Sequence, residues 1–144
     1  MPKRCGWVKM NNPLYLAYHD EEWGQPLHDD RALFELLCME TYQAGLSWET
    51  VLNKRQAFRE VFHGYQIQAV AEITDGELEA LLDNPAIIRN RSKIFATRAN
   101  AQAFLQVQKN YGSFDTYLWS FVEGKTIVND VPDYHLAPAK TALS

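Results

Sequence analysis

The spacing of apolar residues constrains this chain most, because they recur three and four positions apart and almost nowhere alternate with polar ones. That recurrence places side chains on one face of an α-helix, whereas a half-buried strand needs alternation. The one strand-like run, "GKTIVND", is too short to build a sheet. The sequence therefore predicts an all-α fold, and 144 residues suit one domain with a hydrophobic core.

Capping residues mark where the predicted helices begin. The predicted N-caps are Asp29 or Asp30, Ser47, Thr74 or Asp75, and Ser92. The first helix runs to about Ala44, the second covers "WETVLNKRQAFREVF", and the last runs from Lys93 to Lys109. We expect an irregular aromatic-rich segment at 1–28, a helical body at 29–123 and a tail at 124–144. The helix begun by "AKTALS" is too short to be stable alone, so we expect either that the tail frays or that it is incomplete because the chain is a shortened form of a longer protein.

Glu40 falls on a predicted apolar stripe of the first of these helices. The stripe consists of Leu33, Leu36, Leu37 and Ala44, which recur at helical spacing on either side of the acid. Burying a carboxylate is costly unless something pairs with it. The sequence therefore predicts that Glu40 meets a partner.

Positive charge is concentrated in one part of an acidic chain. The net charge is −4, yet the stretch from Asn84 to Phe114 contains no acid and carries +5, which leaves −9 for the rest. The segment "ELEALLDNPAIIRNRSKIFATRANAQAF", which overlaps this stretch, is predicted to form two helices joined by a turn, with Arg89, Arg91 and Lys93 where the second helix begins. Helix–hairpin–helix motifs of this kind bind the DNA backbone without reading its sequence. A solvated basic face on an ordinary helix pair is the other interpretation.

Aromatic residues are dense near the N-terminus. Trp7, Tyr15, Tyr18 and Trp23 lie in one short segment, and Trp48 follows Glu40 by about two helical turns. Packing is the usual role of such side chains. A cluster of this kind with one carboxylate would also suit a flat, electron-poor or cationic ligand.

Cys5 and His19 are both zinc-ligand types, but two ligands do not make a structural site. Cys38 lies in an apolar helical stretch and is predicted to be a small core residue. Two cysteines fit a reducing compartment, so we expect a cytoplasmic protein. The sequence contains neither a long apolar run nor a secretory h-region, so no membrane association is expected.

Several motifs together resemble the DNA-3-methyladenine glycosylase I family of the helix–hairpin–helix glycosylase superfamily. They are "RCGWV", "PLYLAYHDEEWG", "LFELLCMETYQAGLSWETVLNKR", "FREVFHGY", "IIRNRSKIFATRANAQAFL" and "SFDTYLWSFV", in order along essentially the whole chain. The resemblance implies a helical bundle that removes 3-methyladenine from alkylated double-stranded DNA by hydrolysing its N-glycosidic bond. Free 3-methyladenine would be the product, and we expect the protein to be a monomer.

The resemblance also implies roles for individual residues. Glu40 would hydrogen-bond the flipped base, Tyr18 and Trp48 would contact or stack on it, and Trp7, Tyr15 and Trp23 would surround them. Members of this family carry zinc bound by an N-terminal Cys and His and a C-terminal His and Cys. Cys5 and His19 match the first pair, whereas the second pair lies beyond Ser144 and His135 does not match it.

Three further expectations concern mechanism. Leu46, on the turn "AGLSW", is either a wedge that fills the space left by the flipped base or a core residue at a helix junction. Because N3-methyladenine is cationic while attached to the sugar, little general-acid help is needed. With no amine nucleophile suggested, we expect a monofunctional enzyme that leaves an abasic site. A DNA-binding module without catalysis and a zinc-dependent structural protein are the alternatives.

Overall fold

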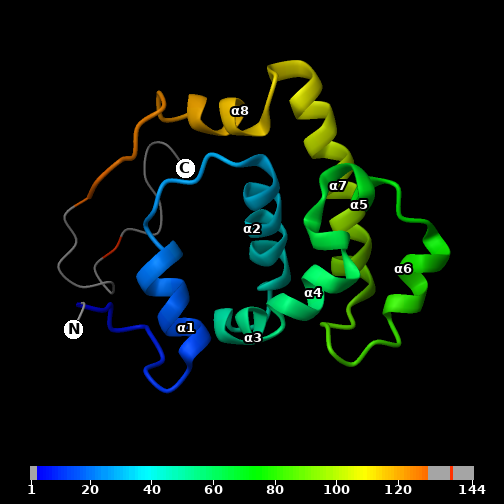
Figure 1. Cartoon of the computed structure of the whole chain (residues 1–144), viewed down its shortest axis with the longest axis horizontal. Coiled ribbons are helices and arrows are strands. Elements are labelled where there is room, and N and C mark those ends of the chain that lie inside the picture. Colours follow the sequence, from blue (N-terminus) through cyan, green and yellow to red (C-terminus); the bar gives the residue numbers. More distant parts are fainter. Residues whose placement is uncertain (1–2, 130–136, 138–144) are drawn as a thin grey trace. The chain divides into compact units, whose positions relative to one another are not determined.

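Helices α2 (Asp30–Tyr42) and α7 (Arg91–Tyr111) are the longest in the computed structural model and pack against each other (Figure 1). The structure describes residues 3–129 and Ala137. These residues contain no strand, so the all-α prediction is confirmed. The helix predicted from Ala139 onward lies outside the described residues. None of the described helices is long and apolar enough to cross a membrane.

The chain divides into two compact units, each described here by itself. Residues 27–124 form one unit, and residues 1–26 with 125–144 form the other. Besides α2 and α7, the larger unit holds α3 (Trp48–Asn53), α4 (Arg55–Val61), the 3₁₀ turn η2 (His63–Tyr65), α5 (Ile67–Ala71), α6 (Asp75–Leu81) and α8 (Phe114–Ser120). The smaller unit holds α1 (Pro13–Ala17) and the π-helical turn η1 (Tyr18–Glu22). The segment 1–28, expected to be irregular, is therefore partly helical.

Side-chain caps begin most of these helices, as the sequence predicts. Asp29 accepts a hydrogen bond from the backbone N–H of Ala32, and Ser47 accepts one from Thr50. Thr74 begins α6 with a reciprocal capping box. The prediction that Ser92 caps the long helix is wrong. Asn90 is its N-cap, because its side chain accepts the N–H of Lys93 and its extended backbone turns the chain into the helix.

The predicted helix "WETVLNKRQAFREVF" is two helices rather than one. Lys54 ends α3 and precedes α4, with backbone dihedrals of φ −100° and ψ 1° that interrupt the helical hydrogen bonding. No glycine or proline marks this break, so tertiary packing rather than local sequence sets it. The buried side chains of the two helices, Val51, Leu52 and Phe58, have exposed fractions of 3% or less.

Aromatic rings fill the core of the larger unit. The Tyr42 ring stacks on Phe58 with centroids 4.3 Å apart, and Phe34 meets Tyr65 edge-on at 5.7 Å. The Tyr42 hydroxyl is within 2.9 Å of the Thr97 hydroxyl and 3.1 Å of the Tyr65 hydroxyl. These hydroxyls satisfy one another's hydrogen bonds, which permits polar atoms in a dry core. Helix α2 contributes to this core through one face.

The buried face of α2 differs from the predicted stripe. It consists of Leu33, Phe34, Glu35, Cys38, Met39 and Tyr42. Leu37 is exposed, as are Glu40 and Ala44, while Leu36 is half-buried. The prediction that Glu40 lies on the buried side is therefore wrong. The apolar residues of α2 occupy most of its circumference, so periodicity alone offers two candidate faces.

Glu35 is the acid that α2 buries. Its exposed fraction is 1%, and α4 supplies both of its partners. Arg55 donates to one carboxylate oxygen at 3.1 Å, and Arg59 donates to both. Burial alone would raise the pKa of Glu35, but hydrogen bonds from Arg59 and Arg55 outweigh it, so the pKa is lowered. A paired carboxylate therefore fixes the rotation of α2 against α4.

Replacing this carboxylate should destabilise the fold. We expect Glu35→Gln to reduce the free energy of unfolding at neutral pH by about 3 kcal/mol, near the low end for breaking a buried pair because both arginines reach solvent. In the parent chain, this stability is present above the ordinary carboxyl pKa of 4.5 and lost as pH falls through the lower folded-state value. Urea unfolding across that pH range measures both effects.

The matched control is Glu40→Gln on the same helix. Because Glu40 is exposed, its loss should change the unfolding free energy by no more than about 0.5 kcal/mol. Equal destabilisation by the two variants would contradict the assignment of Glu35 as the structural acid.

Candidate functional site

Glu40 lies on the side of α2 that faces away from the aromatic core of the larger unit. It makes no hydrogen bond or ion pair with any residue that the structure describes. Six residues further along the chain, the backbone N–H of Leu46 donates to the Gln43 carbonyl at 2.7 Å and closes a tight turn. Gly45 adopts a φ of 79° in that turn, a conformation that glycine accepts without strain. The exposed carboxylate and the exposed Leu46 thus flank the end of one helix.

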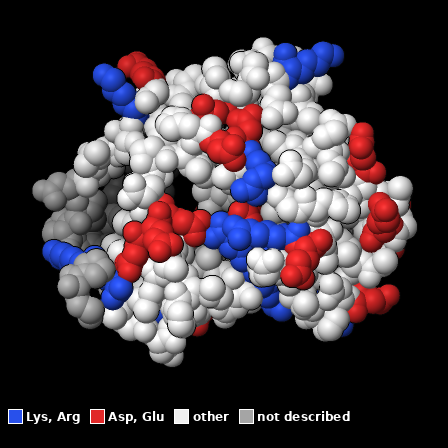
Figure 2. All heavy atoms as spheres, in the orientation of Figure 1, with Lys and Arg blue, Asp and Glu red and all other residues white. Residues whose placement is uncertain are grey.

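The hairpin between α6 and α7 carries the predicted phosphate-binding residues, but only Arg89 is unengaged. The Arg89 side chain is exposed and has no partner among the described residues. Arg91 pairs with Glu79 and lies over the Phe95 ring, 4.4 Å from its centroid. Figure 2 shows basic side chains interspersed with acidic ones on the face in view rather than one continuous basic patch.

Lys93 serves the fold in this structure. Its ammonium donates to the carbonyl oxygens of Tyr42 at 2.8 Å and Ala44 at 2.6 Å. These carbonyls lie at and just after the C-terminal end of α2, where the negative end of the helix dipole attracts a cation. Lys93 therefore ties the start of α7 to the end of α2. Its predicted use as a phosphate contact stays a prediction.

A groove in the larger unit brings Leu46 and Arg89 together from distant parts of the sequence. It has a volume of about 630 Å³. Its lining residues are Leu46, Thr50, Lys54, Leu82, Pro85, Ile87, Ile88 and Arg89. Sequence reasoning missed Lys54, which follows Thr50 by four residues at the end of α3 and lines the groove with it. The groove combines an apolar surface with two cations and no acid.

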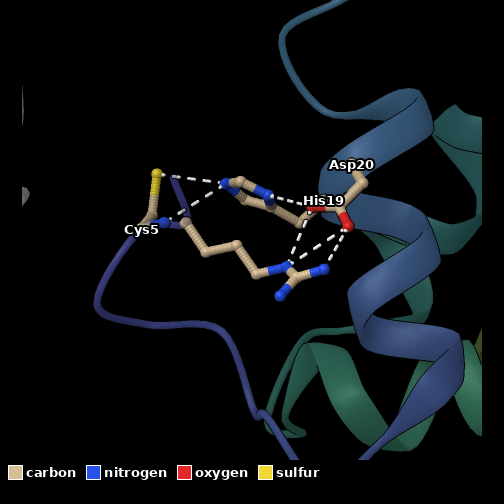
Figure 3. Close-up of polar contacts among 4 residues, drawn as sticks. Cys5, His19 and Asp20 are labelled. Atoms are coloured by element: carbon tan, nitrogen blue, oxygen red, sulfur yellow. Dashed lines mark hydrogen bonds and ion pairs between the residues drawn. The ribbon is translucent and has the colours of Figure 1, made fainter. Parts of the chain in front are cut away.

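In the smaller unit, Cys5 and His19 lie side by side (Figure 3). Cys5 Sγ is 3.3 Å from His19 Nε2, and the Cys5 backbone N–H donates to the same nitrogen at 3.3 Å. On the other side of the ring, His19 Nδ1 lies 3.0 Å from an Asp20 carboxylate oxygen. This places the ring proton on Nδ1 and leaves the lone pair of Nε2 toward Cys5.

Arg4 completes this arrangement and sets the charge of Asp20. The guanidinium of Arg4 donates to both Asp20 oxygens, the shorter contact being 2.7 Å. The hydrogen bond from Arg4, followed by that from His19, lowers the pKa of Asp20 to about 2. Asp20 was missed by sequence reasoning, although its position directly after His19 is the signal that identifies it. Among the described residues, no three His, Cys, Asp or Glu side chains are arranged so that they could together hold a metal ion.

The predicted N-terminal aromatic cluster forms in part. The Trp7 ring contacts Tyr15 at 5.8 Å, His19 at 5.4 Å and Trp23 at 5.4 Å between centroids. The His19 and Trp23 rings stack at 5.6 Å. Trp7 and Trp23 therefore flank the imidazole of His19, while Tyr15 packs on Trp7. Tyr18 is half-buried in η1, and Trp48 is half-buried at the start of α3.

These features define a class of protein: a helical domain with a basic hairpin beside an apolar groove and an unpartnered acid on a neighbouring helix. The family model for methyladenine glycosylase matches residues 7–144. The chain belongs to the methyladenine glycosylase family.

Known proteins agree with this assignment. The DNA-3-methyladenine glycosylase of Haemophilus influenzae is 45% identical over 144 residues, covering 100% of this chain and 77% of the relative. A crystal structure of 3-methyladenine DNA glycosylase I matches with a TM-score of 0.92 at 44% identity, covering 98% of this chain and 77% of that one. A variant of such an enzyme in complex with 3-methyladenine matches with a TM-score of 0.78 at 43% identity, covering 80% and 62%.

The different roles of the two hairpin cations can be measured. We expect Lys93→Met to lower the free energy of unfolding by about 1.5–3 kcal/mol, because two carbonyls lose a charged donor. Arg91→Met should cost no more than about 1 kcal/mol, since its ion pair with Glu79 is exposed to solvent. Urea unfolding of both variants checks this difference, and a Lys93→Met midpoint equal to the parent's would contradict the capping role.

Proposed function

We propose that this chain hydrolyses the N-glycosidic bond of 3-methyladenine in alkylated DNA and leaves an abasic site without cutting the strand. The observation that carries the proposal is the exposed, unpartnered carboxylate of Glu40 on α2 in a member of this family. The same unit presents Leu46 and Arg89 on one groove, where a duplex would lie. Alkylated double-stranded DNA is the substrate, and free 3-methyladenine is one product.

The chemistry requires little of the protein beyond binding and charge stabilisation. A purine methylated at N3 is cationic while attached to the sugar, so it is already a good leaving group. Water adds to C1′ as the bond from C1′ to N9 breaks. The bonding electron pair moves onto the base and neutralises its positive charge, and the water loses a proton to solvent. An abasic sugar and neutral 3-methyladenine result.

Glu40 recognises the base in this proposal. A carboxylate accepts hydrogen bonds from base N–H groups and attracts a cation, which an unmodified adenine is not. The preference for a methylated base thus follows from charge and does not need a strong general acid. Trp48 and Tyr18 are proposed to contact or stack on the base, with Trp7, Tyr15 and Trp23 around it. These five aromatic roles stay predictions.

A base within a duplex must leave the stack before a protein can act on it. We propose that Leu46 fills the space that it vacates. Its side chain is 38% exposed at the tip of a closed turn, so it is already presented to solvent. Flipping a weakly paired, damaged base out of the stack costs less free energy than flipping a normal base, and this difference adds to the selectivity for damaged bases.

Glu40→Gln tests the role of the carboxylate. Removing one charge-assisted contact to a cation should slow release of 3-methyladenine roughly 10- to 100-fold, which is about 1.5–3 kcal/mol. Single-turnover release of free 3-methyladenine from methylated duplex DNA measures this rate. Glu60→Gln, an exposed acid on α4 that does not line the groove, is the control and should keep the parent rate. Release by Glu40→Gln at the parent rate would rule out the assigned role.

We also propose that Cys5 and His19 supply two ligands of a structural zinc site. Tetrahedral zinc with ordinary bond lengths separates a sulfur and a nitrogen ligand by about 3.5 Å. The separation of 3.3 Å between Cys5 Sγ and His19 Nε2 fits two such corners. Asp20 would hold the imidazole in the tautomer that a metal needs. Zinc would fix the start of the chain to η1. Cys5 and His19 would supply two of its ligands, and other residues would supply the rest.

Cobalt binding tests the metal proposal without an activity assay. Thiolate-to-cobalt charge-transfer absorbance should appear on titration and disappear in Cys5→Ala. Asp20→Asn should weaken cobalt affinity about 10- to 100-fold through loss of the oriented imidazole. Cys38→Ala should change nothing, since burial raises the pKa of that thiol to about 12. A cobalt spectrum that persists in Cys5→Ala would contradict the assignment.

Location and assembly complete the proposal. Both cysteines are free thiols in the structure, which supports a reducing compartment such as the cytoplasm. We also propose that the protein acts on DNA as a monomer and does not associate with a membrane.

A further inference from the structure

We propose that Lys54 is a second phosphate-binding residue and that the groove between it and Arg89 seats a segment of DNA backbone. This inference rests on the proposed function, because it takes DNA as the partner. It adds a contact from the junction of α3 and α4, outside the helix–hairpin–helix motif. The groove lies entirely within the larger unit of the chain.

The charges of the groove favour a polyanion. Among its eight lining residues, Lys54 and Arg89 are cations and none is an acid. Neither side chain makes a hydrogen bond or ion pair with a described residue. By contrast, the neighbouring Arg98 pairs with Asp75 at 2.6 Å and donates to the Ile73 carbonyl at 3.1 Å. Unneutralised positive charge near the hairpin is therefore concentrated at this groove.

The apolar surface of the groove suits the remainder of a nucleotide strand. Leu82, Pro85, Ile87 and Ile88 also line it. A DNA backbone alternates charged phosphates with deoxyribose, whose carbon faces are apolar. Phosphates would pair with the cations while sugars contact the aliphatic side chains. Contacts of this kind position the duplex without reading its sequence.

The position of Lys54 relative to Leu46 predicts which phosphate it contacts. Helix α3 lies between them, and its six residues rise about 9 Å at 1.5 Å each. One DNA strand advances about 3.4 Å per nucleotide. Lys54 should therefore contact a phosphate roughly two or three nucleotides from the position that Leu46 occupies in the stack.

Binding to a duplex that contains a tetrahydrofuran abasic-site analogue, measured over a salt series, tests this contact. Lys54→Gln should weaken binding about threefold to tenfold at low salt and reduce the slope of log K against log salt by about 0.9. Lys54→Arg should restore the slope, because it restores the charge. Lys109→Gln, an exposed lysine near the far end of α7, should match the parent.

Neutral methylphosphonate linkages locate the contact. In the parent chain, a linkage two or three nucleotides from the analogue should weaken binding, whereas Lys54→Gln should be insensitive to that linkage alone. A Lys54→Gln variant with the parent's salt slope and the parent's linkage profile would overturn the inference. Failure of the parent chain to release 3-methyladenine would instead refute the proposed activity, while the binding data would still decide the role of Lys54.

Discussion

The ion pair between Glu35 on α2 and the two arginines of α4 is the interaction on which the rest of the structure depends. A buried carboxylate is tolerated only where its charge is compensated, so these partners determine which face of α2 turns inward. Glu40 follows Glu35 by five residues, which is about 140° around a helix. Holding Glu35 inward therefore turns Glu40 outward, where a ligand can reach it.

The end of α2 links this constraint to the groove lined by Leu46 and Arg89. Lys93 caps the final carbonyls of α2 and connects that helix to the start of α7. The turn that follows α2 carries Leu46 to the groove, and the hairpin that precedes α7 carries Arg89 to it. One lysine thus holds together the two segments from which the groove is built.

Local signals predicted much of the fold. Ser47 and Thr74 cap helices where the sequence placed them, since capping depends on residues only three apart. The buried face of α2 could not be predicted from periodicity, because its apolar residues extend around most of the helix. The helix break at Lys54 and the carbonyl contacts of Lys93 could not be predicted either. Both depend on packing between segments that are distant in sequence.

Some residues of the candidate site could likewise be predicted from the sequence, whereas others could not. Glu40, Cys5 and His19 were predicted from the sequence and its family resemblance, and Asp20 could have been predicted from its position directly after His19. Lys54 is placed at the groove only by the three-dimensional structure. Chemistry-bearing residues are recognisable in the sequence, but which of them share a groove is specified by the fold.

Helix α2 carries a buried, paired acid at Glu35 and, five residues later, the exposed acid Glu40 that we propose recognises the base. Calorimetric titration of free 3-methyladenine into the parent chain and into Glu40→Gln, with folding verified by equal urea midpoints, tests that claim most directly. The account predicts that the parent binds the base and that Glu40→Gln binds it at least about tenfold more weakly. Equal affinity in two equally stable chains would contradict it.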